Sequence, residues 1–301
     1  MGADHKQRGY PVRQQAEDDN GPEDAAELIS IVIPAHNEAG YVGACLQSLL
    51  AQDAAAGAVE AIVVANGCSD ATTAIARAHS GAFAARGWRL QVLELPEGSK
   101  PGALNAGDAA AGGALRMYLD ADIRCDPALL GQLRAALAGS EPRYATGRLE
   151  LAPARSRITR LYGDFWRRLP FLRGGAVGAG CYAVNPAGRE RWSTYPPLIA
   201  DDSFARLQFS PAERAEVPAP YHWPLVEGFA ALVRVRRRQN AGMQELFRHQ
   251  PELAVREGKA RLNATGLLRV IMAAPVGFLV YAAVALAVRT QPYGSGWSRG
   301  R

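Results

Sequence analysis

Cysteine is scarce in the 301-residue sequence. Cys45, Cys68, Cys125 and Cys181 lie far apart and form no CxxC pair. This spacing argues against a zinc site and supplies no disulfide framework. A reducing compartment therefore fits the chain best.

A strong charge of one sign is also missing. The formal net charge is +5, and the basic residues are not interleaved with aromatic residues in the pattern typical of nucleic-acid binding. We expect no nucleic-acid partner and favour an anionic lipid or a phosphorylated substrate. Because 48% of the residues are apolar, the chain can bury a sizeable core, as one large α/β domain or two small ones.

Large apolar side chains are almost absent from residues 1–27, which contain the acidic cluster AEDDNGPEDAAE. Such a segment buries too little apolar surface to offset the entropy lost on ordering. We predict a disordered polar tail. The segment also lacks the continuous apolar stretch of a secretory signal, so we expect a cytoplasmic location.

A long apolar run lies near the other end, where residues 270–288, VIMAAPVGFLVYAAVALAV, carry no charge between Arg269 and Arg289. As a helix the run would be about 28 Å long, close to the thickness of a bilayer's hydrocarbon core. Within the C-terminal segment 251–301 we therefore predict a membrane-associated, candidate transmembrane helix over 270–288, with the preceding domain facing the cytoplasm. A buried helix kinked at Pro275, in a soluble cytoplasmic protein, is the alternative.

Apolar runs rich in branched residues alternate with helical patterns in the first part of the chain. The runs are LISIVI (28–33), VEAIVV (59–64), LQVLEL (90–95) and ALRMYL (114–119). Each intervening segment is long enough for a crossover helix, which predicts right-handed βαβ units in an α/β fold, with a mostly parallel sheet and helices on both faces. After residue 140 the pattern loosens, with strands expected in YATGRLEL, in GGAVGAGCYAV and near 214–218, and a basic helix over 225–250.

Polar clusters follow three of these strands: PAHNE, ANGCSD and DAD. Ligands bind beyond the carboxyl ends of parallel strands, so the clusters are expected to share one rim of the sheet. Within MYLDADIRCD, Asp120 and Asp122 are costly to bury unpaired and need solvent or a cation. Their hard oxygen ligands suit Mg²⁺ or Mn²⁺. The alternative is a solvated turn that caps the helix after Pro127.

Taken together, the motifs resemble those of family 2 glycosyltransferases of the GT-A fold. The resemblance covers residues 28–250 and rests on IVIPAHNEAGYVGACLQSLLAQ, VVANGCSDAT, SKPGALNAG, YLDADI, GAGCY, ADDSF and RRRQNAG in the family's order. It implies a GT-A (Rossmann-like) domain that moves a sugar from a nucleotide-diphosphate donor, such as a UDP- or GDP-sugar, to an acceptor hydroxyl. It further implies a divalent metal and inversion at the anomeric carbon.

The resemblance assigns the first donor-binding turn to Pro34, Ala35, Asn37 and Glu38, with Glu38 able to accept a hydrogen bond from the base or ribose. Asn37 could also cap the following helix.

In the second turn Asn66 stands where an Asp that contacts uracil is common, while Asp70 remains, so the donor base stays open. Lys100 and Asn105 match the family's GKxxALNxG element, where a cation near the nucleotide is electrostatically sensible. A solvated surface lysine is the alternative.

Asp120 and Asp122 match the DxD motif, which helps to bind the metal that bridges the donor phosphates. In the family the second Asp contacts the metal directly and the first lies nearer the ribose. Gly178 and Gly180, in GAGCY, would line the pocket between donor and acceptor.

Asp201 and Asp202 match the acidic element that supplies the catalytic base, with Asp202 in the base position. Two adjacent carboxylates could instead cap the helix SFARLQF.

Processive members carry a Q-x-x-R-W element near RVRRRQNAG. Arg238 matches its Arg, but Val235 replaces Gln and Gln239 replaces Trp, so a stacking platform for a growing sugar chain is missing. We therefore expect a single transfer, with Arg238 near the diphosphate or on a positive helix face beside anionic lipid. The acceptor is open and could be lipid-linked or a glycan.

Three other classes remain as alternatives. One is a nucleotidyltransferase of related fold, although its glycine-rich triphosphate loop is absent. A haloacid-dehalogenase-like phosphatase would need DxDxT, and Arg124 occupies its last position. The third is a membrane-tethered module that binds sugar nucleotides without catalysis.

Overall fold

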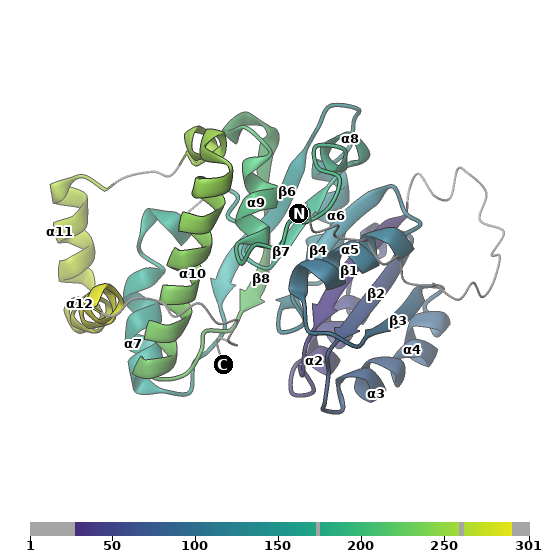
Figure 1. The fold of residues 1–301 in the computed structure, drawn as a ribbon, viewed down its shortest axis with the longest axis horizontal. Helices are drawn as coiled ribbons and strands as arrows, with labels where there is room; N and C mark the ends of the chain where they lie inside the picture. The colour runs from purple at the N-terminus through teal and green to yellow at the C-terminus, as the bar shows by residue number, and fades with distance from the viewer. Residues whose placement is uncertain (1–27, 173–174, 259–261, 291–301) are drawn as a thin grey trace, which may run out of the picture.

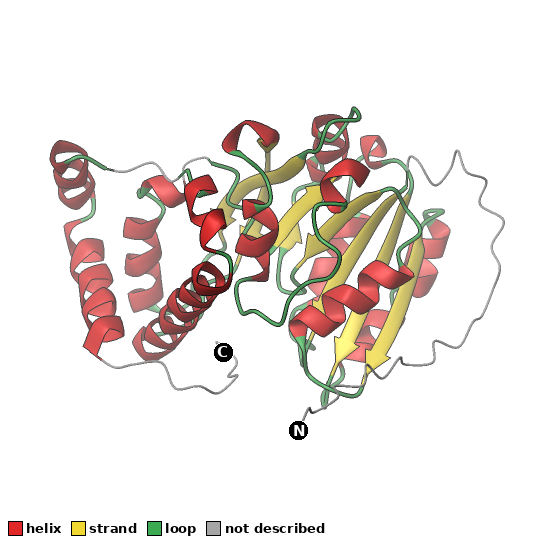
Figure 2. Ribbon diagram, turned by 45° about the horizontal axis from the view of Figure 1, so that its top comes forward, coloured by secondary structure: helices red, strands yellow, loops and turns green. Residues whose placement is uncertain are grey.

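The computed structural model describes residues 28–172, 175–258 and 262–290, so the predicted polar tail lies outside the described residues. A twisted eight-stranded sheet runs through the chain in the order β3-β2-β1-β4-β7-β6-β8-β5 (Figures 1 and 2). The strands are β1 (Ile29–Ala35), β2 (Val59–Asn66), β3 (Arg89–Leu95), β4 (Leu115–Leu119), β5 (Arg124–Cys125), β6 (Tyr144–Leu151), β7 (Cys181–Val184) and β8 (Arg214–Trp223).

The longer helices connect and cover these strands. They are α2 (Val42–Leu50), α3 (Thr72–Arg77), α4 (Ser80–Ala85), α5 (Lys100–Ala110), α6 (Leu129–Ala136), α7 (Arg157–Trp166), α8 (Pro186–Arg189), α9 (Asp201–Leu207), α10 (Phe229–His249), α11 (Ala264–Ala273) and α12 (Pro275–Thr290). Short 3₁₀ helices lie at Ala54–Ala56, Pro170–Leu172, Pro211–Glu213 and Pro251–Arg256.

The first four strands form the predicted parallel unit. Strand β1 pairs in parallel with β2 and β4, and β2 pairs in parallel with β3. Every residue of β1 and β2 is buried, as continuous apolar runs in a sheet covered on both faces should be.

The prediction of a mostly parallel sheet is wrong beyond β4, because the sheet is mixed. Strand β7 is antiparallel to both β4 and β6, and β5 is antiparallel to β8, whereas β6 and β8 are parallel. The strand–helix alternation that requires parallel crossovers ends with β4, and the later connections are free to reverse direction. The strand expected near 214–218 is longer than predicted and reaches Trp223.

Hydrophobic cores lie on both faces of the sheet. Side chains alternate along β1, so Ile31 and Ile33 pack on the face covered by α2, α4 and α6. Val32 points to the other face and packs with Leu104 of α5 and Leu246 of α10. Helices therefore cover both faces, as the alternation predicted.

The continuous helix predicted over 270–288 is wrong, because the segment forms two helices. Helix α11 ends at Ala273, α12 begins at Pro275, and their axes are bent by 113°. Proline lacks the N–H that would continue the helical ladder, and its ring clashes with the preceding turn. Among the described residues no single helix is long and apolar enough to cross a membrane, and the bent pair meets that criterion only when both helices are taken together.

Helix α12 packs along one side on α7. Tyr281 stacks on Tyr162 with ring centroids 5.4 Å apart, and Phe278 lies 5.5 Å from Phe165. A Cβ atom at Gly277 would lie 2.6 Å from the carbonyl oxygen of Leu161, so the two helices approach closely at this point.

We predict that Gly107→Ala destabilises the fold by about 1–3 kcal/mol. A Cβ atom at Gly107 would lie 2.3 Å from Cγ1 of Val32, so α5 would have to move off β1. Gly81→Ala, in α4, is the matched control, because nothing lies within 4 Å of its new Cβ and alanine is favoured over glycine in a helix by up to ~1 kcal/mol. Urea unfolding midpoints test both variants; equal stability of Gly107→Ala and the parent would contradict the tight α5–β1 contact.

Candidate active site

The turns after β1 and β2 meet at the carboxyl edge of the sheet. Pro34 and Ala35 are buried at the end of β1. The Asn66 side chain, at the end of β2, donates to the carbonyl oxygen of Ala35 at 2.8 Å. The predicted sharing of one rim by these two polar clusters is therefore correct.

Asn66 is 2% exposed, and its amide is engaged at both ends. Nδ2 donates to Ala35 and Val64, and Oδ1 accepts from the backbone N–H of Ser99 at 3.0 Å. The side chain thus joins the ends of β1 and β2 to the start of α5. A direct contact between Asn66 and the donor base stays a prediction.

Asn37 has a left-handed backbone, with φ of 53°. Its Oδ1 accepts from the backbone N–H of Ser69 at 2.6 Å, and its own N–H donates to Cys68 Sγ. It does not cap α2, whose N-cap residue is Tyr41. Asn37 instead fastens the first turn to the second.

Asp70 makes a second link between the same two turns. Its carboxylate accepts from the backbone N–H groups of Ala39 at 3.2 Å and Thr72 at 3.0 Å. The Thr72 hydroxyl accepts from the N–H of Glu38 at 2.7 Å. Thr72 was not among the predicted site residues; the available signal was Asp70, since an Asp side chain often accepts from the backbone N–H two residues on.

Lys100, the first residue of α5, forms two ion pairs. Its Nζ lies 2.7 Å from Oδ1 of Asp120 and 3.0 Å from Oδ2 of Asp201. The lysine side chain is 26% exposed and that of Asp201 only 7%, so the alternative of a solvated surface lysine is wrong. Lys100 joins the turn after β4 to the start of α9.

Burial and the ion pairs change the pKa values of both Asp201 and Lys100. Burial raises the pKa of Asp201, the Lys100 ammonium lowers it, and the Asp202 and Asp120 carboxylates raise it further, to about 6 in balance. Burial alone would lower the pKa of Lys100, but Asp120, Asp201 and Asp202 together raise it well above its ordinary value. Lys100 therefore stays charged and compensates the surrounding carboxylates.

Gly178 and Gly180 bring the backbone before β7 against the DxD turn. Both have left-handed φ values, of 59° and 66°. A Cβ atom at Gly180 would lie 2.7 Å from Oδ2 of Asp120, and one at Gly178 would lie 1.8 Å from the Tyr144 hydroxyl. The Gly180 carbonyl accepts from the N–H of Asp120 at 2.8 Å. Glycine is required here because the backbone supports Asp120 directly.

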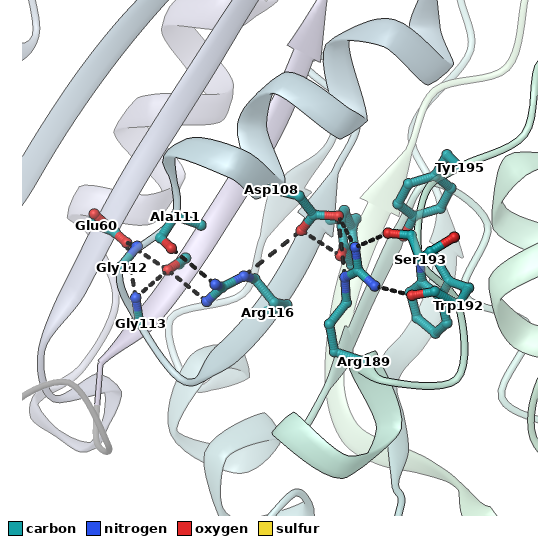
Figure 3. A network of polar contacts seen from close by, with 12 residues as sticks. Glu60, Asp108, Ala111, Gly112, Gly113, Arg116, Arg189, Trp192, Ser193 and Tyr195 are labelled. Carbon is teal, nitrogen blue, oxygen red and sulfur yellow. Dashed lines mark hydrogen bonds and ion pairs between the residues drawn. The ribbon is translucent and has the colours of Figure 1, made fainter. Parts of the chain in front are cut away.

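Helix α5 also positions the segment that leads into α9. Asn105 Nδ2 donates to the carbonyl oxygen of Tyr195 at 3.1 Å, and its Oδ1 accepts from the Tyr195 N–H at 2.7 Å. Figure 3 shows Asp108, further along α5, paired with Arg189 at 2.8 Å, while Arg189 donates to the carbonyl oxygen of Ser193. Asn105 therefore holds the protein's own backbone; the nucleotide contact implied for it stays a prediction.

Asp201 and Asp202 lie in the first turn of α9. The N-cap residue is Ala200, without a side-chain cap. Oδ1 of Asp202 nevertheless accepts from the backbone N–H of Ser203 at 2.6 Å, so this carboxylate does bond to the first turn of the helix. Carboxylates in this turn are favoured by the helix dipole. Asp202 is less buried than Asp201. A Cβ atom at Gly242 of α10 would lie 2.9 Å from Cβ of Ile199, so α10 packs directly behind this turn.

Asp122 is half-buried in the turn after β4, two residues beyond Asp120. Within the part of the chain that the structure describes, no group of three or more His, Cys, Asp or Glu residues could hold a metal ion. Mg²⁺ is nevertheless commonly bound by only one or two protein carboxylates, with water and substrate phosphates as its other ligands. The residues present thus fit a metal bound jointly with a phosphorylated substrate.

The place of Arg238 beside the diphosphate stays a prediction. Arg238 lies on α10, half-buried in the helical layer, and the described residues give it no hydrogen bond or ion pair with the other predicted site residues. Its neighbour Arg236 lies over the Trp166 ring at 5.6 Å, so this basic stretch partly packs against α7.

Residues 30–185 match the model of the family described as glycosyl transferase family 2. Glycosyltransferase AglE of Haloferax volcanii is 34% identical over 101 residues, which cover 33% of this chain and 31% of AglE. The match thus spans about a third of that relative's length.

Two solved structures are similar in fold. Mannosyltransferase PcManGT from Pyrobaculum calidifontis, in complex with GDP-Man and Mn²⁺, is 18% identical with a TM-score of 0.54, over 93% of this chain and 80% of that one. S. aureus TarS 1-349, in complex with UDP-GlcNAc, is 14% identical with a TM-score of 0.51, over 86% and 70% of the two chains. At these identities the likeness concerns the fold alone.

We predict that Lys100→Met lowers the free energy of unfolding by about 1–3 kcal/mol, because it leaves a buried carboxylate without its cation. Arg77→Met is the matched control: it breaks the Arg77–Glu94 pair, whose side chains are 58% and 54% exposed, and should cost at most ~0.5 kcal/mol. Urea unfolding of both variants near neutral pH measures the difference. Equal losses would show that the Lys100 pairs carry no more weight than a surface salt bridge.

Proposed function

The chain belongs to glycosyl transferase family 2; we propose that it is a glycosyltransferase that moves a sugar from a UDP- or GDP-sugar to an acceptor hydroxyl, with inversion at the anomeric carbon. The observation that carries the proposal is the Lys100 bridge, with Asp120 at 2.7 Å and Asp201 at 3.0 Å. The bridge places the carboxylate after β4, proposed to lie at the donor phosphates, beside the carboxylates of α9, proposed to act on the acceptor. Sugar transfer requires these two groups to be close together. The complexes of the two fold neighbours with GDP-Man and UDP-GlcNAc support a nucleotide-sugar donor.

The turns after β1 and β2 form the donor side of this site. Their backbones are fixed to each other through Asn37, Asn66 and Asp70, so the rim is preorganised before a donor binds. A rigid rim lowers the entropy cost of holding the nucleotide in one orientation. Glu38, half-buried in the first turn, is placed to accept from the base or ribose.

A divalent cation, Mg²⁺ or Mn²⁺, held by Asp122 and Asp120 together with the donor phosphates, would neutralise the negative charge that grows on the leaving diphosphate. The Mn²⁺ in the PcManGT complex supports this part of the proposal. Lys100 adds a fixed positive charge beside Asp120 and keeps that carboxylate in one orientation.

Asp202 is the general base of the proposed reaction. Its carboxylate takes the proton of the acceptor hydroxyl while the acceptor oxygen forms a bond to the anomeric carbon. The bond from that carbon to the diphosphate oxygen breaks, and its electron pair leaves with the diphosphate. Asp202 is the more open of the two α9 carboxylates, whereas Lys100 holds Asp201 in a buried ion pair. Asp201 is therefore a positioning residue.

The reaction is proposed to stop after one transfer. Val235 and Gln239 occupy α10 positions where a processive enzyme would need Gln and Trp, and an aliphatic side chain and an amide offer no aromatic face on which a sugar ring can stack. The acceptor is a hydroxyl of a lipid-linked molecule or of a glycan.

Purified protein incubated with a panel of UDP- and GDP-sugars and Mn²⁺ tests the donor class through release of nucleoside diphosphate. Turnover of one donor supports the proposal. Release of pyrophosphate from a nucleoside triphosphate and a sugar phosphate, without turnover of any nucleotide sugar, would identify a nucleotidyltransferase instead.

We predict that transfer requires a divalent cation. Excess EDTA should abolish turnover, and added Mn²⁺ should restore it. Asp122→Asn should weaken Mn²⁺-dependent donor binding, measured by calorimetry, by about tenfold or more, because it removes one hard anionic ligand. Donor affinity in Asp122→Asn that equals the parent's at every Mn²⁺ concentration would remove Asp122 from the metal site.

We predict that Asp202→Asn lowers transfer by roughly 10²–10⁴-fold, the range for losing a positioned acid or base. Donor affinity should change little, because the donor side lies on the other turns. Asp164→Asn, on an α7 carboxylate that is 49% exposed, is the matched control and should keep full activity. An Asp202→Asn variant that loses donor binding and transfer in equal measure would contradict the base role.

A further inference from the structure

Large apolar side chains gather on the outside of the α11–α12 pair. Eleven are exposed among the residues that the structure describes, and six of them lie on this pair: Leu267, Leu268, Met272, Val276, Leu279 and Leu286. Helix α11 has no buried residue at all. Such a concentration on one short segment is typical of an interaction surface, whereas single exposed leucines are ordinary.

Helix α12 has two distinct apolar faces. Gly277 and Val284 are buried on the side that packs against α7. Val276, Leu279 and Leu286 are 55%, 65% and 64% exposed, and their spacing puts them together on the opposite side of the helix. The catalytic domain therefore holds α12 in place while half of its apolar surface stays uncovered.

The charges on the two helices have one sign. Neither helix contains Asp or Glu, and the charged residues of the pair are Arg269 and Arg289. Arg269 and Arg289, on the two helices, are exposed. An anionic surface complements these charges, whereas a second copy of the same face would meet them with like charges.

No single helix among the described residues is long and apolar enough to cross a bilayer. The axes of α11 and α12 are bent by 113°, and Tyr281 of α12 stacks on Tyr162 of α7. Because one side of α12 is committed to α7, only its other side is available to lipid. An amphipathic helix in the plane of the membrane keeps those contacts and buries only its outer face.

We propose that the α11–α12 pair docks the enzyme onto the surface of an anionic lipid bilayer. The exposed apolar side chains enter the boundary between headgroups and acyl chains, and Arg269 and Arg289 contact lipid phosphates. Figure 1 places the pair at the end of the molecule remote from β2 and β3, so the nucleotide-binding turns stay in water. The docking holds whether or not the proposed sugar transfer is correct.

Flotation of the full chain with vesicles tests the docking. The protein should float with vesicles of phosphatidylcholine mixed with phosphatidylglycerol, and much less with phosphatidylcholine alone. Leu279→Glu/Leu286→Glu should bind the anionic vesicles about tenfold or more weakly. Arg269→Gln/Arg289→Gln should bind them roughly thirtyfold more weakly, from about 1 kcal/mol for each charge near the surface.

Val255→Glu is the matched control, because Val255 is 86% exposed outside the pair and should bind vesicles like the parent. Circular dichroism of each variant shows that it is folded. Unchanged flotation of both double variants overturns the proposal. Retention after an alkaline carbonate wash also overturns it, because a surface-docked protein is released and a spanning one is not. A third result would overturn the proposal in favour of a dimer interface. In that case the parent sediments as a dimer without lipid, Leu279→Glu/Leu286→Glu sediments as a monomer, and neither protein binds vesicles.

Discussion

Lys100 is a single positive charge placed between carboxylates that come from opposite halves of the sheet. Asp120 follows β4, the last strand of the parallel unit β1–β4, and Asp201 begins α9 in the mixed half. Both carboxylates lie within 3.0 Å of the Lys100 ammonium and are therefore close to each other. Without this cation they would repel each other in a poorly hydrated site. The ion pairs therefore set the distance between the turn after β4 and the start of α9.

Helix α5 makes contacts that fix other segments of the site as well. Its first residue is Lys100, its middle holds Tyr195 through Asn105, and its last turn holds Arg189 through Asp108. Because the helix packs on β1 with no room for a side chain at its closest point, these three attachments are held to the sheet as one unit. A rigid support of this kind is what a reaction needs when base, acceptor and donor must align.

Different parts of the chain supply the polar rim of the sheet and the apolar surface of α12. The parallel strands supply the turns of the proposed donor side, and the mixed half supplies the acidic turn of α9. Beyond them, α7 and α10 carry α12, whose outer surface is apolar and flanked by arginines. One chain thus has a polar rim for a charged substrate and, at its far end, a surface suited to lipid, and rigid helices separate the two.

The sequence by itself determined the strands β1 to β4, the turns that follow them and the candidate residues on the rim. Branched apolar runs and strand-end polar residues are local signals, and a parallel βαβ unit has one favoured handedness. Only the tertiary structure decided that β7 runs antiparallel, that Asn66 and Asn105 bind the protein's own backbone, that Lys100 serves two aspartates at once, and that the apolar run breaks at Ala274. Those outcomes depend on which distant groups are packed together, and neither strand direction nor the partner of a buried charge is encoded in the residues beside it.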